Sequence, residues 1–353
     1  MTRSILIMAG GTGGHIFPAL AVADCLRAQG WRITWLGARN SMEAELVPKH
    51  GYTIAWVRFS GLRGKGWLRQ VLLPFNLLIA LAQSAAALLR HRPDVVLGMG
   101  GYITFPGGLM AALLKRPLLI HEQNSIAGLS NKVLAKLATR VLCGFPKVLP
   151  QAEWCGNPVR DSITALPEPE ARYTARTGAL NLLVVGGSLG AKAINDCVPQ
   201  ALALLPVNAR PLVLHQTGKQ HFVAVQAAYQ LAGVTAELKP FLDDMAGHYG
   251  WADIVICRAG ALTIAELAAA GVASILIPFP FAVDDHQTGN AHFLSEHNAA
   301  LLLPQSQLNA RTLADLLRNM TRAHALQMAQ AARKLAKPEA AQRVAQVCME
   351  LVC

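Results

Sequence analysis

The stretch from residue 251 to residue 291, WADIVICRAGALTIAELAAAGVASILIPFPFAVDDHQTGNA, decides the fold class of this chain. Residues 253–257 form a short apolar, β-branched run, which is typical of a buried parallel strand. After a turn, residues 261–270 are expected to form a helix, and Gly271 supplies the left-handed position that ends it. A second strand follows at 273–279. Such a unit places its turn and helix start at the carboxyl edge of a parallel sheet, where open α/β folds bind ligands.

The start of the helix over 261–270 is a candidate anion site. Its first turn offers backbone N–H groups and a positive dipole end, which suit a phosphate. Glu266, later on the same helix, can accept hydrogen bonds from a ribose. For the helix alone, an ordinary capped crossover is the preferred interpretation. The polar cluster at 284–287, directly after the next strand, favours a ligand site.

Composition limits the function classes. The 353 residues favour two domains, because single cores stop growing at about 250–300 residues. Hydrophobic residues make up 53% and charged residues 15% of the chain, and the net charge is +11. This basic balance indicates an anionic partner, such as a nucleotide or a phospholipid surface. Aromatic content of 6%, with no run that interleaves aromatic and basic residues, argues against nucleic-acid binding.

The cysteines give no metal-binding or disulfide pattern. There are seven, an odd number, and no C-x-x-C occurs. This usage predicts reduced, buried thiols in a cytoplasmic protein. The apolar run at the N-terminus is too short for a signal peptide.

The chain also opens with a strand, a glycine-rich turn and a helix. A strand over 5–9 leads into Gly10-Gly-Thr-Gly-Gly-His15, and the βαβ alternation that follows predicts a parallel, doubly wound sheet. The pattern restarts with a strand over 181–185 and the turn Gly186-Gly-Ser-Leu-Gly-Ala191. The chain is therefore expected to form two similar Rossmann-like halves facing one cleft. The polar, proline-containing segment 166–178 is the expected linker.

Residues 71–89 contain no charge. Their length would admit a membrane span, which needs roughly 20 apolar residues, but proline and polar residues interrupt the run. A crossover helix is therefore expected here. Apolar side chains beside cations predict either a patch for an anionic membrane surface or a loop packed on its own helix. The residues of this expected membrane patch are Trp67, Leu68, Leu72, Leu73 and Phe75.

Neither glycine turn is a dinucleotide fingerprint or a P-loop, because the third glycine and the Lys-Ser/Thr ending are missing. No D-x-D occurs, so a metal-bridged diphosphate is not indicated, and no cofactor is predicted. A leaving diphosphate would instead need backbone amides, Ser188 and a cation such as Arg160. For a proton acceptor, His15 is the first candidate, since its ordinary pKa suits proton removal near neutral pH. Glu122 is a competing base or an orienting group.

Several motifs, taken together, resemble one family across nearly the whole chain. They are Gly10-Gly-Thr-Gly-Gly-His15, His121-Glu-Gln-Asn124, Gly156-Asn-Pro-Val-Arg160, Gly186-Gly-Ser-Leu-Gly-Ala191, Arg258-Ala-Gly-Ala-Leu-Thr-Ile-Ala-Glu266 and Asp285-His-Gln287. In this combination and order they are similar to the MurG family of bacterial N-acetylglucosaminyltransferases. The resemblance implies the two-domain GT-B glycosyltransferase fold. It implies an acceptor-binding, membrane-facing domain over 1–162, a UDP-GlcNAc-binding domain over 163–336, and a last helix, 337–353, that packs back on the first domain.

The resemblance also implies roles for individual residues. Thr12, Gly13 and Gly14 would line the cleft and face the acceptor diphosphate, and Asn124, Arg160 and Ser188 would contact the donor or its phosphates. Leu242 would present its backbone to the uracil. The helix residues Ala261, Leu262, Thr263, Ile264, Ala265 and Glu266 would hold phosphate and ribose. His286 and Gln287 would read the hydroxyls of GlcNAc.

The implied reaction is an inverting transfer of GlcNAc from UDP-GlcNAc to the 4-hydroxyl of MurNAc in lipid I, undecaprenyl-pyrophosphoryl-MurNAc-pentapeptide, which gives lipid II for peptidoglycan synthesis. The implied location is peripheral, at the cytoplasmic face of the bacterial inner membrane. Two alternatives stay open at this point. A UDP-sugar 2-epimerase shares the two-domain architecture, and a non-catalytic nucleotide-binding protein at a membrane surface would account for the basic, apolar segment.

Overall fold

The computed structural model describes residues 2–59, 73–187 and 190–352. Trp67, Leu68, Leu72 and Ser188 lie outside these ranges. The chain divides into two compact units. Unit 1 comprises Met1–Arg160 and Lys337–Cys353, and unit 2 comprises Asp161–Ala336.

Unit 1 is built on a parallel sheet with strand order β3-β2-β1-β4-β5-β6-β7. Its strands are β1 (Ser4–Met8), β2 (Arg32–Ala38), β3 (Thr53–Val57), β4 (Val95–Gly98), β5 (Leu118–Glu122), β6 (Arg140–Cys143) and β7 (Glu153–Trp154). Its helices are α1 (Gly13–Ala28), α2 (Met42–Lys49), α4 (Leu73–His91), α5 (Thr104–Leu113), α6 (Leu129–Leu134) and α16 (Ala340–Glu350). The central strands β1, β4 and β5 are buried along their whole length, as apolar strands covered by helices on both faces must be.

Unit 2 repeats this plan with the parallel order β10-β9-β8-β11-β12-β13. Its strands are β8 (Asn181–Val185), β9 (Leu212–Gln216), β10 (Glu237–Lys239), β11 (Ile254–Cys257), β12 (Ala273–Leu276) and β13 (Ala300–Leu302). Its α-helices are α7 (Asp161–Thr164), α8 (Pro169–Thr174), α9 (Lys192–Ala203), α10 (Phe222–Leu231), α11 (Met245–Trp251), α12 (Ala261–Ala270), α13 (His286–Ser295), α14 (Ala310–Arg318) and α15 (Arg322–Lys334). Short 3-10 turns lie at Val207–Ala209, Val283–Asp285 and Gln305–Gln307.

The two sheets confirm the predicted fold class, two doubly wound Rossmann-like domains. In each sheet the strand order reverses beside the first strand, between β1 and β4 and between β8 and β11. In such sheets the loops that follow these strands at the carboxyl edge form the ligand crevice. The glycine turns after β1 and β8 and the turn before α12 all lie at these points.

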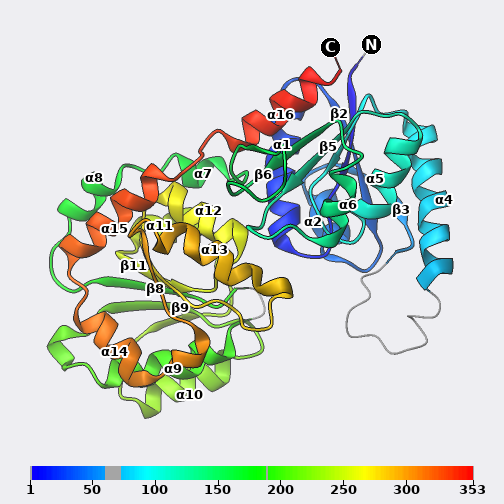
Figure 1. Ribbon diagram of the computed structural model, residues 1–353. Coiled ribbons are helices and arrows are strands. Elements are labelled where there is room, and N and C mark those ends of the chain that lie inside the picture. Colours follow the sequence, from blue (N-terminus) through cyan, green and yellow to red (C-terminus); the bar gives the residue numbers. More distant parts are fainter. Residues whose placement is uncertain (1, 60–72, 188–189, 353) are drawn as a thin grey trace. The chain divides into compact units, whose positions relative to one another are not determined.

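Helix α16 belongs to unit 1, although 176 residues of unit 2 separate it from the rest of that unit. It packs against α1, and Val344, Val347 and Cys348 lie in the same buried cluster as Ile16 and Leu20 (Figure 1). The Arg343 guanidinium pairs with Glu153 of β7 at 2.6 Å, so both an apolar face and an ion pair hold the helix in place.

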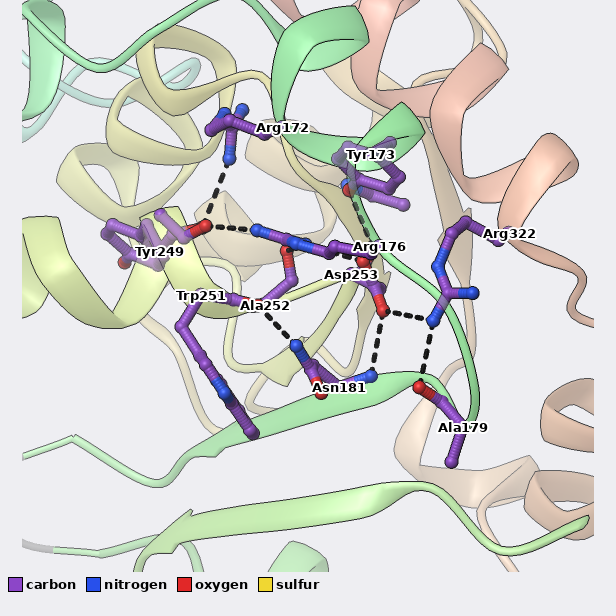
Figure 2. A network of polar contacts seen from close by, with 12 residues as sticks. Arg172, Tyr173, Arg176, Ala179, Asn181, Tyr249, Trp251, Ala252, Asp253 and Arg322 are labelled. Atoms are coloured by element: carbon purple, nitrogen blue, oxygen red, sulfur yellow. Dashed lines mark hydrogen bonds and ion pairs between the residues drawn. The ribbon is translucent and has the colours of Figure 1, made fainter.

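The prediction of a linker at 166–178 is wrong, because this segment is an integral part of unit 2. Tyr173 of α8 is 1% exposed, and its hydroxyl donates to the carbonyl of Asp253 at 2.7 Å. Arg172 donates to the carbonyls of Ala270 and Gly271, at the end of α12. Figure 2 shows Tyr173 beside Asp253 and Arg172 directed toward the carbonyl of Tyr249. The polar composition that suggested a linker serves instead to satisfy buried carbonyls and a buried carboxylate.

The uncharged run at 71–89 coincides largely with α4, as predicted for a crossover helix. Among the described residues, none of the helices has the length and apolarity required to cross a membrane.

Candidate active site

The first glycine turn leads directly into α1, which begins at Gly13 rather than at the predicted Ile16. Thr12 is the N-cap residue, but its side chain makes no capping hydrogen bond. The first amides of the helix, those of Gly13 and Gly14, are therefore not satisfied by the cap side chain and point out of the helix end. This arrangement, together with the helix dipole, favours a bound anion.

A buried carboxylate that the sequence analysis missed holds this turn in place. Glu43 of α2 is fully buried, and it accepts hydrogen bonds from the amides of Gly11 at 3.2 Å and Ala38 at 3.3 Å. Burial and the adjacent Glu43 carboxylate raise the pKa of Tyr102 to about 12. Glu43 thus ties together the loops after β1, β2 and β4. An isolated glutamate on an expected helix carries no local signal of such a role.

His15 is half-buried in the first turn of α1. Its Nδ1 atom lies 2.7 Å from Oε1 of Gln123, which follows β5. Gln123 in turn lies 3.0 Å, through Nε2, from Nδ1 of the buried His121. The structure therefore links the predicted base to strand β5 by a series of hydrogen bonds between side chains, which begins at the start of α1.

Glu122 is 2% exposed and forms the last residue of β5. Its carboxylate accepts from the amides of Asn124 at 2.9 Å and Gly128 at 3.1 Å, and from the side-chain amide of Asn131 at 2.8 Å. Both carboxylate oxygens are thus engaged by donors of the loop and helix that follow β5. Of the two roles left open by the sequence, this geometry favours the orienting role.

The predicted donor contacts of unit 1 lie near these groups. Asn124 is in the loop that Glu122 holds, and Arg160 ends the first segment of the unit, Met1–Arg160. The guanidinium of Arg160 lies 5.9 Å from the ring centre of Phe17 on α1, which places it beside the helix that carries His15.

In unit 2, α12 spans Ala261–Ala270, as the sequence predicted, and Gly271 ends it with φ 58° in the left-handed region. The N-cap residue Gly260 has no side chain, so it cannot cap the amides of the first turn. Glu266 is 6% exposed on the same helix, and the Tyr249 hydroxyl donates to its carboxylate at 3.2 Å. The helix thus presents backbone donors at its start and a positioned carboxylate about one turn later.

A cavity of about 510 Å³ lies beside the carboxyl edge of this second sheet. Its lining residues are Gly190, Ala191, Lys192, Ala193, Asp196, Arg258, Phe279, Gln287 and Gln305. Arg258 donates to the carbonyl of Ile277 at 3.0 Å and to Oε1 of Gln305 at 2.6 Å, and burial lowers its pKa. Gln287 accepts from the amide of Phe279 through Oε1, so its NH₂ group is the end left to meet a ligand.

For the remaining predicted residues of unit 2 that it describes, the structure gives their position in the fold but no contact with the cavity. His286 begins α13, and its Nδ1 lies 2.7 Å from the carbonyl of Val283, so Nδ1 carries a proton. Leu242 is 3% exposed in the segment after β10. Ser188 falls outside the described residues.

Of the expected membrane patch in unit 1, Leu73 begins α4 and Phe75 is 63% exposed.

Comparison with known proteins gives a consistent result for both units. Residues 5–143 match the Glycosyltransferase family 28 N-terminal domain, and residues 181–344 match the Glycosyltransferase family 28 C-terminal domain. The chain is 61% identical to a protein of Aromatoleum aromaticum over 99% of this chain and 98% of that protein. It is 60% identical, with the same coverage of both chains, to a protein of Cupriavidus metallidurans.

Both relatives bear the name UDP-N-acetylglucosamine–N-acetylmuramyl-(pentapeptide) pyrophosphoryl-undecaprenol N-acetylglucosamine transferase. Among solved structures, the crystal structure of Acinetobacter baumannii MurG is 40% identical, with a TM-score of 0.87 and coverage of 99% of each chain. The chain therefore belongs to the MurG family of N-acetylglucosamine transferases, within glycosyltransferase family 28.

Proposed function

We propose that this protein transfers GlcNAc from UDP-GlcNAc to the 4-hydroxyl of MurNAc in lipid I, with inversion at the sugar, and so forms lipid II. The observation that carries the proposal is the half-buried imidazole of His15, set among the open amides at the start of α1 in a chain of this family. The names of the relatives favour transfer over the epimerase alternative.

Unit 1 would bind the lipid-linked acceptor. The amides of Gly13 and Gly14 would receive its diphosphate beside Thr12, because the start of α1 favours an anion. His15 lies one residue further along the helix, so the 4-hydroxyl of the sugar that carries the diphosphate, across the ring from it, would come within reach of the imidazole.

Unit 2 would bind UDP-GlcNAc. The amides of Ala261, Leu262 and Thr263 would receive the nucleotide phosphates, and Glu266 would accept hydrogen bonds from the ribose hydroxyls. Gln287 would donate to the sugar from the wall of the cavity, and His286 would contact the same sugar. Leu242 would present its backbone to the uracil. Asn124, Arg160 and Ser188 would contact the donor or its diphosphate.

The proposed reaction is a single displacement at C1 of the donor sugar. The 4-hydroxyl oxygen of MurNAc forms a bond to C1 of GlcNAc while the bond from C1 to the UDP oxygen breaks, and attack from the opposite face gives the β-linkage. The hydroxyl proton passes to His15, and the negative charge leaves with UDP. Backbone amides at helix starts and the cation of Arg160 would stabilise that charge as it develops.

The test is transfer of radiolabelled GlcNAc from UDP-GlcNAc to a short-chain lipid I analogue. Label in the lipid product, with no reaction of the nucleotide sugar in the absence of acceptor, supports the proposal. Release of an epimerised free sugar from UDP-GlcNAc alone would support the epimerase. Binding of UDP-GlcNAc without any transfer would support the non-catalytic alternative.

We also propose that unit 1 sits on the anionic cytoplasmic face of the bacterial inner membrane. Helices α4, α5 and α6 pack in sequence, α4 on α5 and α5 on α6 (Figure 1). These helices expose large apolar side chains, namely Phe75, Leu78, Leu113, Leu129 and Val133, and Leu137 is exposed just after α6. Exposed lysines at 115, 132 and 136 lie among them. Apolar side chains with interspersed cations are what a peripheral membrane site requires.

Co-sedimentation with vesicles that contain anionic lipid tests this surface. The double variant Phe75→Ser, Leu78→Ser should reduce binding to anionic vesicles. The matched control is Val223→Ser, Leu231→Ser, which removes two exposed apolar residues from α10 of unit 2. Unchanged binding by the α4 variant, or an equal loss in the control, would contradict the proposed membrane surface.

A further inference from the structure

Three side chains of unit 1 form a continuous line of hydrogen bonds, which we call the imidazole chain: His15, Gln123 and His121. Nδ1 of His15 lies 2.7 Å from Oε1 of Gln123, and Nε2 of Gln123 lies 3.0 Å from Nδ1 of His121. At the far end, Nε2 of His121 lies 2.9 Å from the carbonyl oxygen of Gly156. His121 and Gln123 are both buried.

The proton positions along this chain follow from its buried end. The carbonyl of Gly156 can only accept, so Nε2 of His121 carries the proton. Burial lowers the pKa of His121 to about 4, and the ring is therefore neutral near neutral pH. A neutral imidazole has one N–H, which leaves Nδ1 of His121 as an acceptor.

The orientation of the Gln123 amide is fixed by the same reasoning. Its Nε2 faces two acceptors, Nδ1 and the carbonyl oxygen of His121, each at 3.0 Å. A flipped amide would place its oxygen against both of them. Oε1 therefore faces His15 as an acceptor, and Nδ1 of His15 must donate to it. The neutral ring of His15 then carries its lone pair on Nε2.

The loop after β4 encloses the bond between His15 and Gln123. A Cβ atom on Gly100 would lie 2.7 Å from Nδ1 of His15 and 3.0 Å from Oε1 of Gln123. Gly100 also has φ 91°, a conformation that favours glycine. Its backbone thus approaches the bond more closely than any other residue type would permit, and the enclosed bond holds the ring in one orientation.

We propose that Gln123 and His121 are positioning residues that hold His15 as the Nδ1–H tautomer, so that Nε2 is the atom that receives the hydroxyl proton of the acceptor. This inference rests on the proposed function, in which His15 is the base. The partner of His15 is a neutral amide rather than a carboxylate, so it orients the ring without placing a negative charge beside it.

The first test is spectroscopic and does not depend on turnover. Long-range ¹H–¹⁵N correlation spectra of protein labelled with ¹⁵N-histidine distinguish Nδ1–H from Nε2–H rings, and the signal of His15 is assigned by its loss in His15→Ala. The wild-type protein should show the Nδ1–H pattern, and Gln123→Met should show a mixture of both tautomers. An Nε2–H ring in the wild-type protein, or an unchanged Nδ1–H pattern in Gln123→Met, would overturn the inference.

The second test separates positioning from binding. Gln123→Met should lower kcat about 100-fold, since misplacement of a reacting group costs this order, while KM for UDP-GlcNAc changes little. Gln123→Glu keeps an acceptor for Nδ1–H of His15 but sets its second oxygen against the two acceptors of His121, so it should recover only part of kcat at high pH. Its carboxylate also stabilises the imidazolium, so the acid limb of the pH–rate profile should move up by about one pH unit or more. The Glu122 charge that acts on His121 is unchanged in both variants.

The matched control for the added charge is Gln29→Glu. Gln29 is exposed at the other end of α1, about 21 Å from His15 at 1.5 Å per residue. It should leave both kcat and the pH–rate profile unchanged. A wild-type profile for Gln123→Glu, or equal shifts in both variants, would overturn the positioning role. Near-normal turnover of His15→Ala would instead remove the base from the proposed function, whatever the tautomer spectra show.

Discussion

The two units share the same order over six strands, to which unit 1 adds β7, yet a carboxylate in equivalent positions has different partners in each. Asp94 precedes β4 and Asp253 precedes β11, and each lies beside the start of the first strand of its sheet. Asp94 is half-buried and accepts from the amide and hydroxyl of Ser4, at 2.7 and 3.0 Å. Asp253 is fully buried and accepts from the amide of Asn181 at 2.9 Å.

The two carboxylates differ in their cationic partners. Asp253 is also paired with Arg176 at 2.5 Å and with Arg322 at 3.3 Å (Figure 2). Both positions need an acceptor for the first amide of the neighbouring strand. Where the carboxylate keeps contact with water, one serine suffices. Where it is fully enclosed, guanidinium groups must replace the water, because an unpaired buried charge is costly.

A second comparison concerns two buried histidines in strands that do not hold equivalent places in the two sheets, and only one of them is connected to the proposed site. Both units bury a histidine in a strand, His121 in β5 and His215 in β9. His215 lies 3.0 Å from both the Tyr229 hydroxyl and Oδ1 of Asn195, all of them buried, so its hydrogen bonds end inside the core. The bonds of His121 continue to the half-buried His15. A buried neutral histidine therefore becomes part of a site only where its chain of bonds reaches the surface.

The largest expected effect is a loss of turnover that distinguishes the catalytic role proposed for unit 1 from the donor binding proposed for unit 2. His15→Ala in unit 1 should lower kcat by about 10²- to 10⁴-fold, the usual contribution of a general base, with little change in affinity for UDP-GlcNAc. Steady-state transfer kinetics and calorimetric titration of UDP-GlcNAc measure the two quantities. Turnover within a few-fold of the wild-type value would rule out His15 as the base.

The next effect sharpens the comparison of the carboxylates. Asp253→Ala should reduce the free energy of unfolding of unit 2 by about 3–5 kcal/mol, because two guanidinium groups lose their buried partner. Asp94→Ala should cost unit 1 only about 1–2 kcal/mol, since it removes hydrogen bonds from a half-buried group. Hydrogen exchange of peptides from each sheet, followed by mass spectrometry, reports the units separately. Equal losses would show that the arginines contribute nothing specific.

Glu266→Ala should weaken UDP binding about 10- to 100-fold, because hydrogen bonds to a charged group contribute about 1.5–3 kcal/mol. This change in unit 2 should leave binding of the acceptor unaffected. Conversely, His15→Ala in unit 1 should leave binding of UDP-GlcNAc almost unaffected. Isothermal titration with UDP measures it. An unchanged dissociation constant would contradict the assignment of Glu266 to the ribose.

A further effect, measured as a slope against pH rather than as a single loss, is a shared sensitivity to acid. Burial lowers the pKa of His121 to about 4 and that of His215 to about 3, while an unfolded histidine titrates near 6.5. The unfolded state therefore binds more protons between these values, so stability is full above pH 6.5 and falls as the pH drops toward 4. Each histidine should contribute about 1.4 kcal/mol per pH unit in this window.

The variant His215→Gln isolates the contribution of unit 2. The pH dependence of unfolding of that unit should become shallower between pH 6.5 and 4, while unit 1 keeps its wild-type slope. Denaturant titrations followed by hydrogen exchange at several pH values measure both slopes. An unchanged slope in unit 2 would show that other groups cause its acid sensitivity.

Much of the fold was predictable because its signals are local. The bounds of β8 and α12 match the predictions, since apolar β-branched runs and a left-handed glycine act over a few residues. The linker prediction failed because the partners of Arg172, at Ala270 and Gly271, lie about 100 residues away. A polar, proline-containing sequence cannot reveal that its arginines cap a distant helix.

The candidate site was predictable only in part, for the same reason. His15 stood out because it ends a glycine-rich turn at a helix start. Glu43 did not, because its partners Gly11 and Tyr102 come from other loops and only the folded sheet brings them together. Gln123 was visible only as a member of a motif, and its role emerged from two distances to neighbouring imidazoles.

The position of α16 has a consequence for how the chain is made. The ribosome completes unit 2 before it releases the helix that covers α1, so unit 2 can fold while the core of unit 1 is still open. Nascent unit 1 therefore exposes an apolar strip until the final segment emerges. Deletion of residues 337–353 should accordingly leave a chain in which unit 2 is folded and unit 1 is a substrate for chaperones and proteases.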